Sequence, residues 1–138
     1  MGSSNAGEAT RGNETILLVD DEPAIRALMS RGLTSQGYRV LVAENGARAL
    51  DVADAYKAPI HLVVSDVEMP DMDGPELFRN LRTWYPRLRF LFISGRLDRA
   101  DPDISIDGRT AFLPKPFSLE SLFKFVRYVL DNETGKAP

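Results

Sequence analysis

The sequence predicts an α/β fold in which helices cover both faces of a parallel sheet. Short apolar runs, several of them rich in β-branched residues, alternate with segments whose apolar residues recur at helical spacing. The connections between these segments are short, so successive strands are expected to run parallel and to be joined by right-handed crossovers. At 138 residues the chain is long enough for one domain of this kind.

Five apolar runs are expected to form the strands. Residues 16–19 follow one another without a polar side chain, which is typical of a strand buried on both faces of a sheet. The other runs are residues 38–42, 61–66, 90–94 and 111–113. No internal repeat or second domain is visible in the sequence.

Helices are expected after each of the first three strands and after the fifth. Asn45 and Ser118 are suited to cap the second and the last helix, Pro75 fits the first turn of the third, and Gly37 ends the first. The apolar positions expected to face the sheet are Ile25, Leu28, Met29 and Leu33 in the first helix, Ala49, Leu50 and Ala53 in the second, Leu77, Phe78 and Leu81 in the third, and Leu119, Leu122, Phe123, Val126 and Leu130 in the last.

Residues 96–107, between the fourth and fifth strands, break this pattern. They carry Pro102 and four aspartates and have little apolar periodicity. Proline and aspartate both disfavour a helix interior, so any helix here is expected to be short or frayed. We therefore predict that this segment is the least ordered part of the folded domain.

Composition excludes several classes of function. The chain has no cysteine, which rules out disulfides and thiolate chemistry and fits a reducing, cytoplasmic location. Its net charge of −3 indicates neither a nucleic-acid partner nor contact with an anionic membrane. No apolar run approaches the roughly 18 residues that a membrane span needs.

Polar segments flank the predicted domain. Residues 1–13 are rich in Gly, Ser and Asn and lack the apolar stretch of a signal peptide. We interpret them as a flexible lead-in or linker. Residues 14–131 are expected to form the folded domain and residues 132–138 a flexible tail.

Acids, a hydroxyl and an ammonium group occur where the strands end. Asp20 and Asp21 follow the first strand, Asp66 ends the third, Ser94 ends the fourth, and Lys115 lies just beyond the fifth. Because the carboxyl ends of parallel strands meet at one edge of a sheet, these side chains are expected to converge there.

Three carboxylates in one crevice need compensating positive charge. Unit charges about 4 Å apart repel by roughly 4 kcal/mol at an effective dielectric constant near 20. Lys115 and a hard cation such as Mg²⁺ would relieve this repulsion. Such a site suits phosphoryl transfer, with a carboxylate as the nucleophile. A plainer interpretation is that Asp20 and Glu22 only cap the following helix.

Four motifs at these strand ends resemble the receiver domain of bacterial two-component response regulators. They are Val-Asp-Asp-Glu at residues 19–22, Asp-Val-Glu-Met-Pro-Asp-Met-Asp-Gly at 66–74, Ser-Gly at 94–95 and Lys-Pro-Phe at 115–117. The resemblance spans residues 14–130 and implies a flavodoxin-like (CheY-like), doubly wound parallel sheet of order 2-1-3-4-5. It also implies Mg²⁺ as cofactor and a histidine kinase or histidine phosphotransfer domain as phosphodonor.

Carried over by position, the resemblance makes Asp66 the phosphoacceptor. Asp21 and Asp66 are then direct ligands of Mg²⁺, the backbone carbonyl of Glu68 completes the protein ligands, and Asp20 acts largely through water. On this assignment the protein is no conventional enzyme, because it catalyses only its own phosphorylation and dephosphorylation.

The resemblance also implies a switch. Lys115 pairs with the phosphoryl group, Ser94 is the switch hydroxyl, and Phe112 is the switch aromatic. Phosphorylation is expected to draw Ser94 toward the phosphoryl group and to let Phe112 turn inward. Taken singly, each has an ordinary role: a strand-end cap for Ser94, a core side chain for Phe112 and a solvated charge for Lys115.

The chain departs from the usual receiver pattern in three places. Residues 96–107 are polar where a helix of the output face is usual, Arg109 follows Gly108 where a small residue is common, and Arg96 lies near the mouth of the site. Arg96 and Glu68 each lie two residues beyond a site position. We hypothesise that they meet across the mouth and slow the loss of the phosphoryl group.

Other functions and contexts remain open on the sequence. A phosphorylation-independent interaction module would be expected to have lost an acid or the lysine. A Mg²⁺-dependent phosphatase of the haloacid dehalogenase type would carry an Asp-x-Asp-x-Thr/Val signature, which residues 20–24 do not supply. The chain is either a stand-alone regulator or a receiver from a hybrid sensor kinase, whose parent would be a histidine kinase. The polar lead-in favours the hybrid kinase.

Overall fold

The structure, a computed structural model, describes residues 9–95 and 109–132. Within them, five strands form one parallel sheet in the order β2-β1-β3-β4-β5. The strands are β1 (Thr15–Val19), β2 (Arg39–Ala43), β3 (Leu62–Asp66), β4 (Arg89–Ser94) and β5 (Thr110–Pro114). The predicted α/β class and strand order are confirmed.

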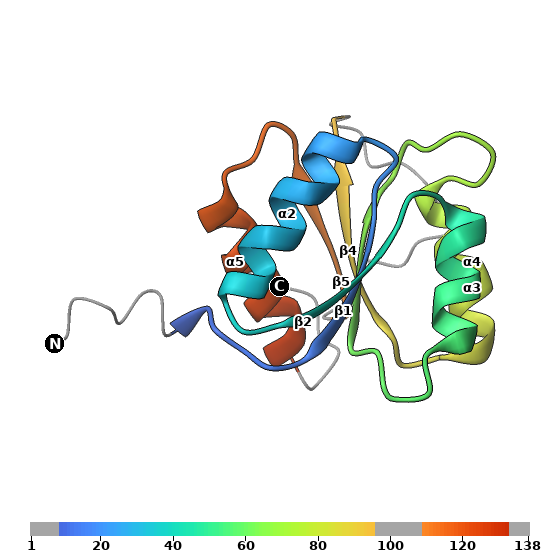
Figure 1. Cartoon of the computed structure of the whole chain (residues 1–138), viewed down its shortest axis with the longest axis horizontal. Coiled ribbons are helices and arrows are strands. Elements are labelled where there is room, and N and C mark those ends of the chain that lie inside the picture. Colours follow the sequence, from blue (N-terminus) through green and yellow to red (C-terminus); the bar gives the residue numbers. More distant parts are fainter. Residues whose placement is uncertain (1–8, 96–108, 133–138) are drawn as a thin grey trace, which may run out of the picture.

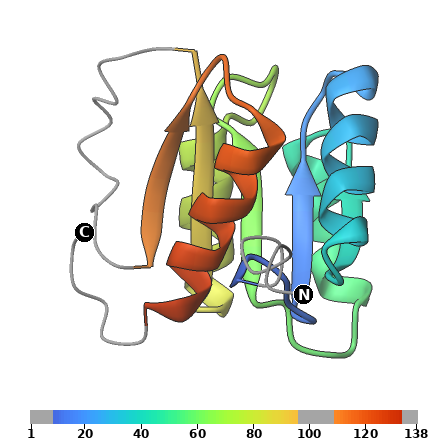
Figure 2. The same cartoon turned by 90° about the vertical axis from the view of Figure 1, so that its left-hand side faces the viewer.

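Helices cover both faces of this sheet. They are α2 (Pro23–Ser35), α3 (Gly46–Ala55), α4 (Gly74–Trp84) and α5 (Leu119–Asp131). Helices α2 and α5 pack on one face and α3 and α4 on the other, as Figure 1 shows, and Figure 2 views the sheet from the α5 side. Within the described ranges, no helix is long and apolar enough to cross a membrane.

Alternation along β1 divides the apolar interior into two layers. Ile16 and Leu18 belong to the layer beneath α2 and α5, whereas Leu17 and Val19 belong to the layer beneath α3 and α4. All four side chains are fully buried. Because successive strand residues point to opposite faces, a strand covered on both sides is expected to be apolar over most of its length.

Local signals in the sequence set where most helices begin. The side chains of Asn45 and Ser118 each accept a hydrogen bond from the backbone amide three residues later, at 2.7 and 3.0 Å, so both predicted caps are confirmed. Asp73 caps α4 in the same way. Glu22 holds the N-cap position of α2, but its side chain makes no capping bond. The plainer interpretation, that Asp20 and Glu22 only cap this helix, therefore holds for the position of Glu22 but not for a capping bond from its side chain.

Local expectations differ from the structure for one side chain and for the strand ends, which differ by one residue from those expected. Leu28 was expected to face the sheet but is 49% exposed, because Met29 and Leu33 fill the inner face of α2. The second strand begins at Arg39 and leaves Tyr38 outside it, because the backbone ladder to β1 starts with the pair Thr15 and Arg39.

The chain before β1 is bonded to the folded body. The Gly12 amide donates to the Gln36 carbonyl oxygen at 3.1 Å, and the Tyr38 hydroxyl donates to the Thr10 carbonyl oxygen at 3.0 Å. These bonds hold the segment against the end of α2. The domain boundary expected at residue 14 stays a prediction.

Arg127 of α5 ties several segments together. Its guanidinium donates to the two Glu14 carboxylate oxygens at 3.1 and 2.7 Å, to the Tyr38 hydroxyl at 3.1 Å and to Asp131 at 2.8 Å. The hydrogen bond between Arg127 and Glu14 is the main reason why the pKa of Arg127 is raised and that of Glu14 is lowered. The Arg127 side chain is only 16% exposed, so water screens these bonds weakly.

Replacing Arg127 by Gln should lower the free energy of unfolding by about 1–3 kcal/mol, because Glu14 would lose its charged partner. Lys124→Gln is the matched control. Its 3.8 Å pair with Glu120 is largely exposed, and its removal should cost less than about 0.5 kcal/mol. Urea unfolding at pH 7 compares the two variants. Equally small losses would contradict the role of Arg127.

Candidate functional site

The predicted site residues lie along one edge of the sheet. Asp20 and Asp21 directly follow β1, Asp66 ends β3, Ser94 ends β4, and Lys115 directly follows β5. The parallel register brings these strand ends beside one another. The convergence expected from the sequence is therefore produced by strand pairing.

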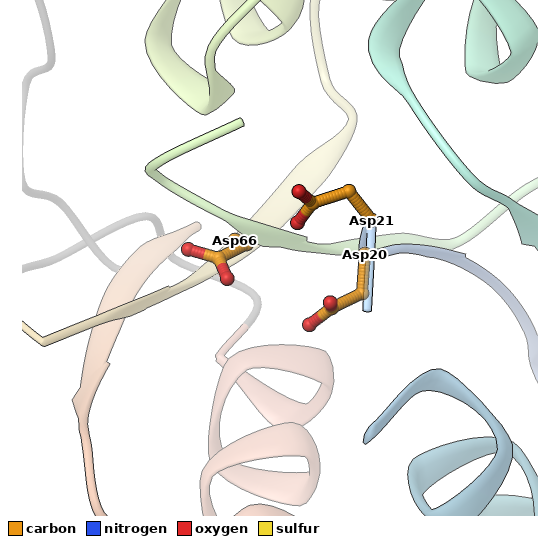
Figure 3. Close-up of side chains that lie close together, drawn as sticks. All are labelled: Asp20, Asp21 and Asp66. Atoms are coloured by element: carbon orange, nitrogen blue, oxygen red, sulfur yellow. The ribbon is translucent and has the colours of Figure 1, made fainter. Parts of the chain in front are cut away.

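Asp20, Asp21 and Asp66 form an acidic cluster. One carboxylate oxygen of each residue lies within 4.8 Å of those of the other two. Figure 3 shows Asp20 and Asp21 extending from the end of β1 toward the side on which Asp66 lies. Asp20 is fully buried and Asp66 is 3% exposed, whereas Asp21 is open to solvent.

The Asp66 carboxylate is held by two donors. Its Oδ2 accepts a hydrogen bond from Lys115 Nζ at 2.8 Å, and its Oδ1 accepts one from the Glu68 amide at 3.0 Å. Lys115 follows β5 in the chain, and its amide donates to the Ser94 carbonyl oxygen at 2.8 Å. The side chain that neutralises Asp66 is thus positioned by the end of β4.

Burial and charge act in opposite directions on Lys115. Burial by itself lowers the pKa of the Lys115 ammonium. The hydrogen bond and charge of Asp66, with a further contribution from Asp20, outweigh burial and raise this pKa overall. The site therefore keeps Lys115 protonated at neutral pH.

Asp20 is the acid whose charge is least compensated. Its Oδ1 accepts a hydrogen bond from the Glu22 amide at 2.8 Å, whereas its buried Oδ2 has no hydrogen-bond partner among the described residues. Burial raises the pKa of Asp20; the Glu22 amide opposes the rise and the charge of Asp66 adds to it. A buried carboxylate oxygen without a donor calls for a partner, and a water molecule or a cation could supply it.

The donor set fits a hard divalent cation. Three carboxylates in reach of one point, two of them buried, supply oxygen ligands of the type that Mg²⁺ prefers. The unpartnered Oδ2 of Asp20 gives such an ion, or a water molecule bound to it, a group to contact. The acidic cluster is thus a candidate Mg²⁺ site.

Hydrogen bonds to backbone carbonyl oxygens position the loops that carry the acids. Arg26 Nη1 donates to the Asp20 carbonyl oxygen at 2.7 Å, and the Gly74 amide donates to the Val67 carbonyl oxygen at 2.9 Å. A Cβ atom at Gly74 would lie 2.6 Å from the Asp66 carbonyl oxygen, so α4 can start this close to β3 only with glycine. The turn motif signals this glycine, but no pattern in the sequence marks Arg26.

The two expected switch residues lie at different depths. Ser94 is 4% exposed and pairs with Pro114 at the end of the sheet. Phe112 lies before the end of β5, half-buried, with its ring stacked on Phe92 at a centroid separation of 5.2 Å. Phe112 therefore belongs to the apolar layer beneath α3 and α4 and not to the acidic cluster.

Several expectations concern residues 96–108, which lie outside the described residues. They are the short or frayed helix and low order of residues 96–107, and the pair of Arg96 with Glu68. All of them stay predictions.

Comparison with known sequences identifies related proteins. Residues 16–127 match the response regulator receiver domain family. The sensor kinase CckA of Brucella abortus is 42% identical over 123 residues, which are 88% of this chain and 13% of the kinase. The response regulator MprA of Mycolicibacterium vanbaalenii is 38% identical over 120 residues, 86% of this chain and 51% of that protein. The chain thus spans about half of one relative and far less of the other.

Solved structures show the same similarity. The receiver domain of the hybrid histidine kinase CckA has a TM-score of 0.71 and 36% identity, covering 84% of this chain and 98% of that domain. The response regulator TrrA of Thermotoga maritima, solved in complex with Mg²⁺-BeF, has a TM-score of 0.73 and 29% identity, with 84% and 98% coverage.

Asp20→Asn should stabilise the metal-free protein at neutral pH. The pKa of Asp20 is raised in the folded state. The stability that Asp20 contributes is therefore fully present below its unfolded pKa of about 3.9, where the carboxyl group is protonated. This stability is lost as the pH rises through the folded pKa. The gain in unfolding free energy should therefore be small near pH 4 and reach about 1–2 kcal/mol at pH 7.

Urea unfolding in EDTA at both pH values measures this gain. Asp54→Asn, which replaces an exposed acid of α3, is the control and should change stability by less than about 0.5 kcal/mol. A gain for Asp20→Asn that is the same at both pH values would argue against a buried charge as its cause.

Proposed function

The chain belongs to the response regulator receiver domain family of two-component systems, and we propose that Asp66 is the residue that receives the phosphoryl group. The observation that carries this proposal is the position of its carboxylate. Asp66 ends the central strand of the sheet, beside two other acids and in contact with the Lys115 ammonium. The donor would be a phosphohistidine of a histidine kinase or of a histidine phosphotransfer domain.

In the proposed transfer, a carboxylate oxygen of Asp66 attacks the phosphorus atom of the phosphohistidine. The O–P bond forms, the P–N bond to the imidazole breaks, and the imidazole nitrogen keeps the electron pair. Lys115 Nζ, 2.8 Å from Asp66 Oδ2, is placed to contact the transferred phosphoryl oxygens. The Ser94 hydroxyl, on the neighbouring strand, would donate a hydrogen bond to another of these oxygens.

The proposed metal ligands are the carboxylates of Asp21 and Asp66 and the backbone carbonyl of Glu68, with Asp20 acting through water. When bound, Mg²⁺ would neutralise charge on the phosphoryl oxygens in the transition state. The exposed position of Asp21 leaves this side of the cluster open to solvent. The buried Asp20 carboxylate would gain a partner for its Oδ2 atom.

Ser94 and Phe112 are the proposed switch. With a phosphoryl group on Asp66, the Ser94 side chain would move toward it, and the space beside β4 would admit the Phe112 ring. Phe112 lies on β5, at the edge of the sheet. A rotation of its ring would therefore change the surface that β5 and α5 present to a protein partner.

The alternative of a different class is a binding module that works without phosphorylation. The acids and Lys115 are all present and lie together, which supports the phosphoacceptor function over that module. A phosphatase of the haloacid dehalogenase type is further disfavoured, because residues 20–24 lack its signature.

We propose residues 14–131 as the receiver unit of a longer hybrid sensor kinase. The 42% identity to a sensor kinase supports this context over a stand-alone regulator. The parent protein would then be a histidine kinase, and its own phosphohistidine or that of a phosphotransfer domain would be the donor. A cytoplasmic location of the domain follows from that context.

An apolar groove beside the site is the proposed contact surface for the phosphodonor. It has a volume of about 390 Å³ and lies between α2 and the start of α5. Ile25, Leu28 and Phe117 provide apolar walls, and Lys115 belongs to the groove and to the site at once. A donor that brings its phosphohistidine to Asp66 would therefore bury Leu28, which is otherwise 49% exposed.

Asp66→Asn should reduce labelling by acetyl phosphate in Mg²⁺ by at least about 100-fold, because the nucleophilic oxygen is lost. Chelation of Mg²⁺ by EDTA should reduce labelling of the wild type as well. Asp54→Asn is the control and should be labelled like the wild type. Intact-mass spectrometry measures the fraction phosphorylated. Undiminished labelling of Asp66→Asn would overturn the assignment.

Leu28→Gln should slow transfer from a phosphorylated histidine phosphotransfer domain about tenfold, because it removes apolar contact area from the donor interface. Its labelling by acetyl phosphate should not change. Val42→Gln is the matched control, since Val42 is 46% exposed on β2. If Leu28→Gln slows both donors equally, Leu28 acts on the site itself and not on docking.

A further inference from the structure

A second pocket lies at the opposite edge of the sheet, and we propose that it binds a small aromatic anion. The pocket has a volume of about 490 Å³ and is lined by the loop from α3 to β3 and the loop from α4 to β4. In Figure 1 both loops lie at the lower edge of the sheet, whereas the loop from β3 to α4, next to Asp66, lies at the upper edge. The pocket is therefore separate from the acidic cluster.

Aromatic side chains form much of the pocket wall. Tyr56 and Tyr85 are the C-cap residues of α3 and α4, and Trp84 is the last residue of α4. Trp84 is 78% exposed, the largest fraction among the exposed large hydrophobic side chains of the described residues. Flat rings at the rim of a pocket offer surfaces on which a planar ligand can stack.

The charged groups of the pocket are cationic. Among the described residues that line it are Arg87 and Arg89, and none is acidic. Arg89 is already engaged, because its Nε and Nη2 atoms donate to the carbonyl oxygens of Val129 and Asn132 at 2.9 and 3.0 Å. Arg87 has neither a hydrogen bond nor an ion pair to any described residue. In a chain with a net charge of −3, an unpaired arginine beside a pocket without acids favours an anion.

His61 adds a second polar group. Its Nδ1 atom accepts a hydrogen bond from the Thr15 amide at 3.0 Å. The ring proton of the neutral imidazole must therefore be on Nε2, which makes this atom a donor. A guanidinium and an imidazole N–H in one pocket can both bind an anionic oxygen.

These features together define the class of ligand. A neutral aromatic molecule would leave Arg87 without a partner, and a simple anion would leave the rings of Tyr56, Trp84 and Tyr85 uncovered. A planar ring that carries a phosphate or carboxylate group satisfies both. The volume of about 490 Å³ lies within the usual range of small-molecule sites, about 300–1,000 Å³, and suits a mononucleotide.

Tryptophan fluorescence gives a direct test of ligand binding in this pocket. Trp84 is the one tryptophan of the chain, so its fluorescence reports on this pocket alone. The whole chain is titrated in EDTA with adenosine 5′-monophosphate as probe, and calorimetry counts the sites in parallel. We expect saturable quenching at one site, and binding of adenosine and of inorganic phosphate that is at least about tenfold weaker.

Two variants decide the role of the cation. Arg87→Gln should weaken binding of the probe about tenfold or more. Arg31→Gln, which removes an exposed arginine of α2, is the control and should bind like the wild type. Absence of saturable binding in calorimetry, or unchanged affinity in Arg87→Gln, would overturn the proposal. Binding of phosphate or of adenosine as tight as that of the probe would also overturn the proposal, because the anionic group or the aromatic ring alone would then account for the affinity.

Discussion

The parallel register of the strands is the constraint on which the rest of the structure depends. A slip of β3 by one residue would turn Asp66 to the opposite face of the sheet and separate it from the acids that follow β1. The register is fixed by apolar burial on both faces, because every residue of β3 is buried. It continues into the loops, where the Val67 amide bonds to the Ile93 carbonyl oxygen at 2.9 Å. The core thus holds the site in place.

The same edge of the sheet carries an electrostatic cost. Asp20 and Asp66 are buried beside each other, and a buried charge is tolerated only with partners. Lys115 and the Glu68 amide serve Asp66, whereas one oxygen of Asp20 has no donor among the described residues. Stability and chemistry therefore conflict at Asp20, and binding of a cation would relieve the conflict.

Charge is divided between the two edges of the sheet. The edge formed by the carboxyl ends of the strands holds the acidic cluster. The opposite edge, formed by their amino ends, holds Arg87 and Arg89 with the aromatic side chains around them. A net charge of −3 conceals this division of charge, because it sums over both edges.

Two arginines also anchor α5 at the edge opposite the acidic cluster. Arg89 fastens the end of α5 to β4, and Arg127 fastens α5 to the segment before β1. Helix α5 is thus held at this edge by two arginines.

The sequence by itself determined the order of the elements, the caps of two helices, and the acids at the strand ends, because these depend on residues close together in the chain. A cap such as Asn45 bonds an amide three residues away. Only the tertiary structure decided that Leu28 stays exposed, that Arg26 holds the Asp20 carbonyl, and that Trp84 borders a pocket. Those outcomes depend on which helix or loop packs beside each residue, and packing partners distant in the chain leave no local pattern.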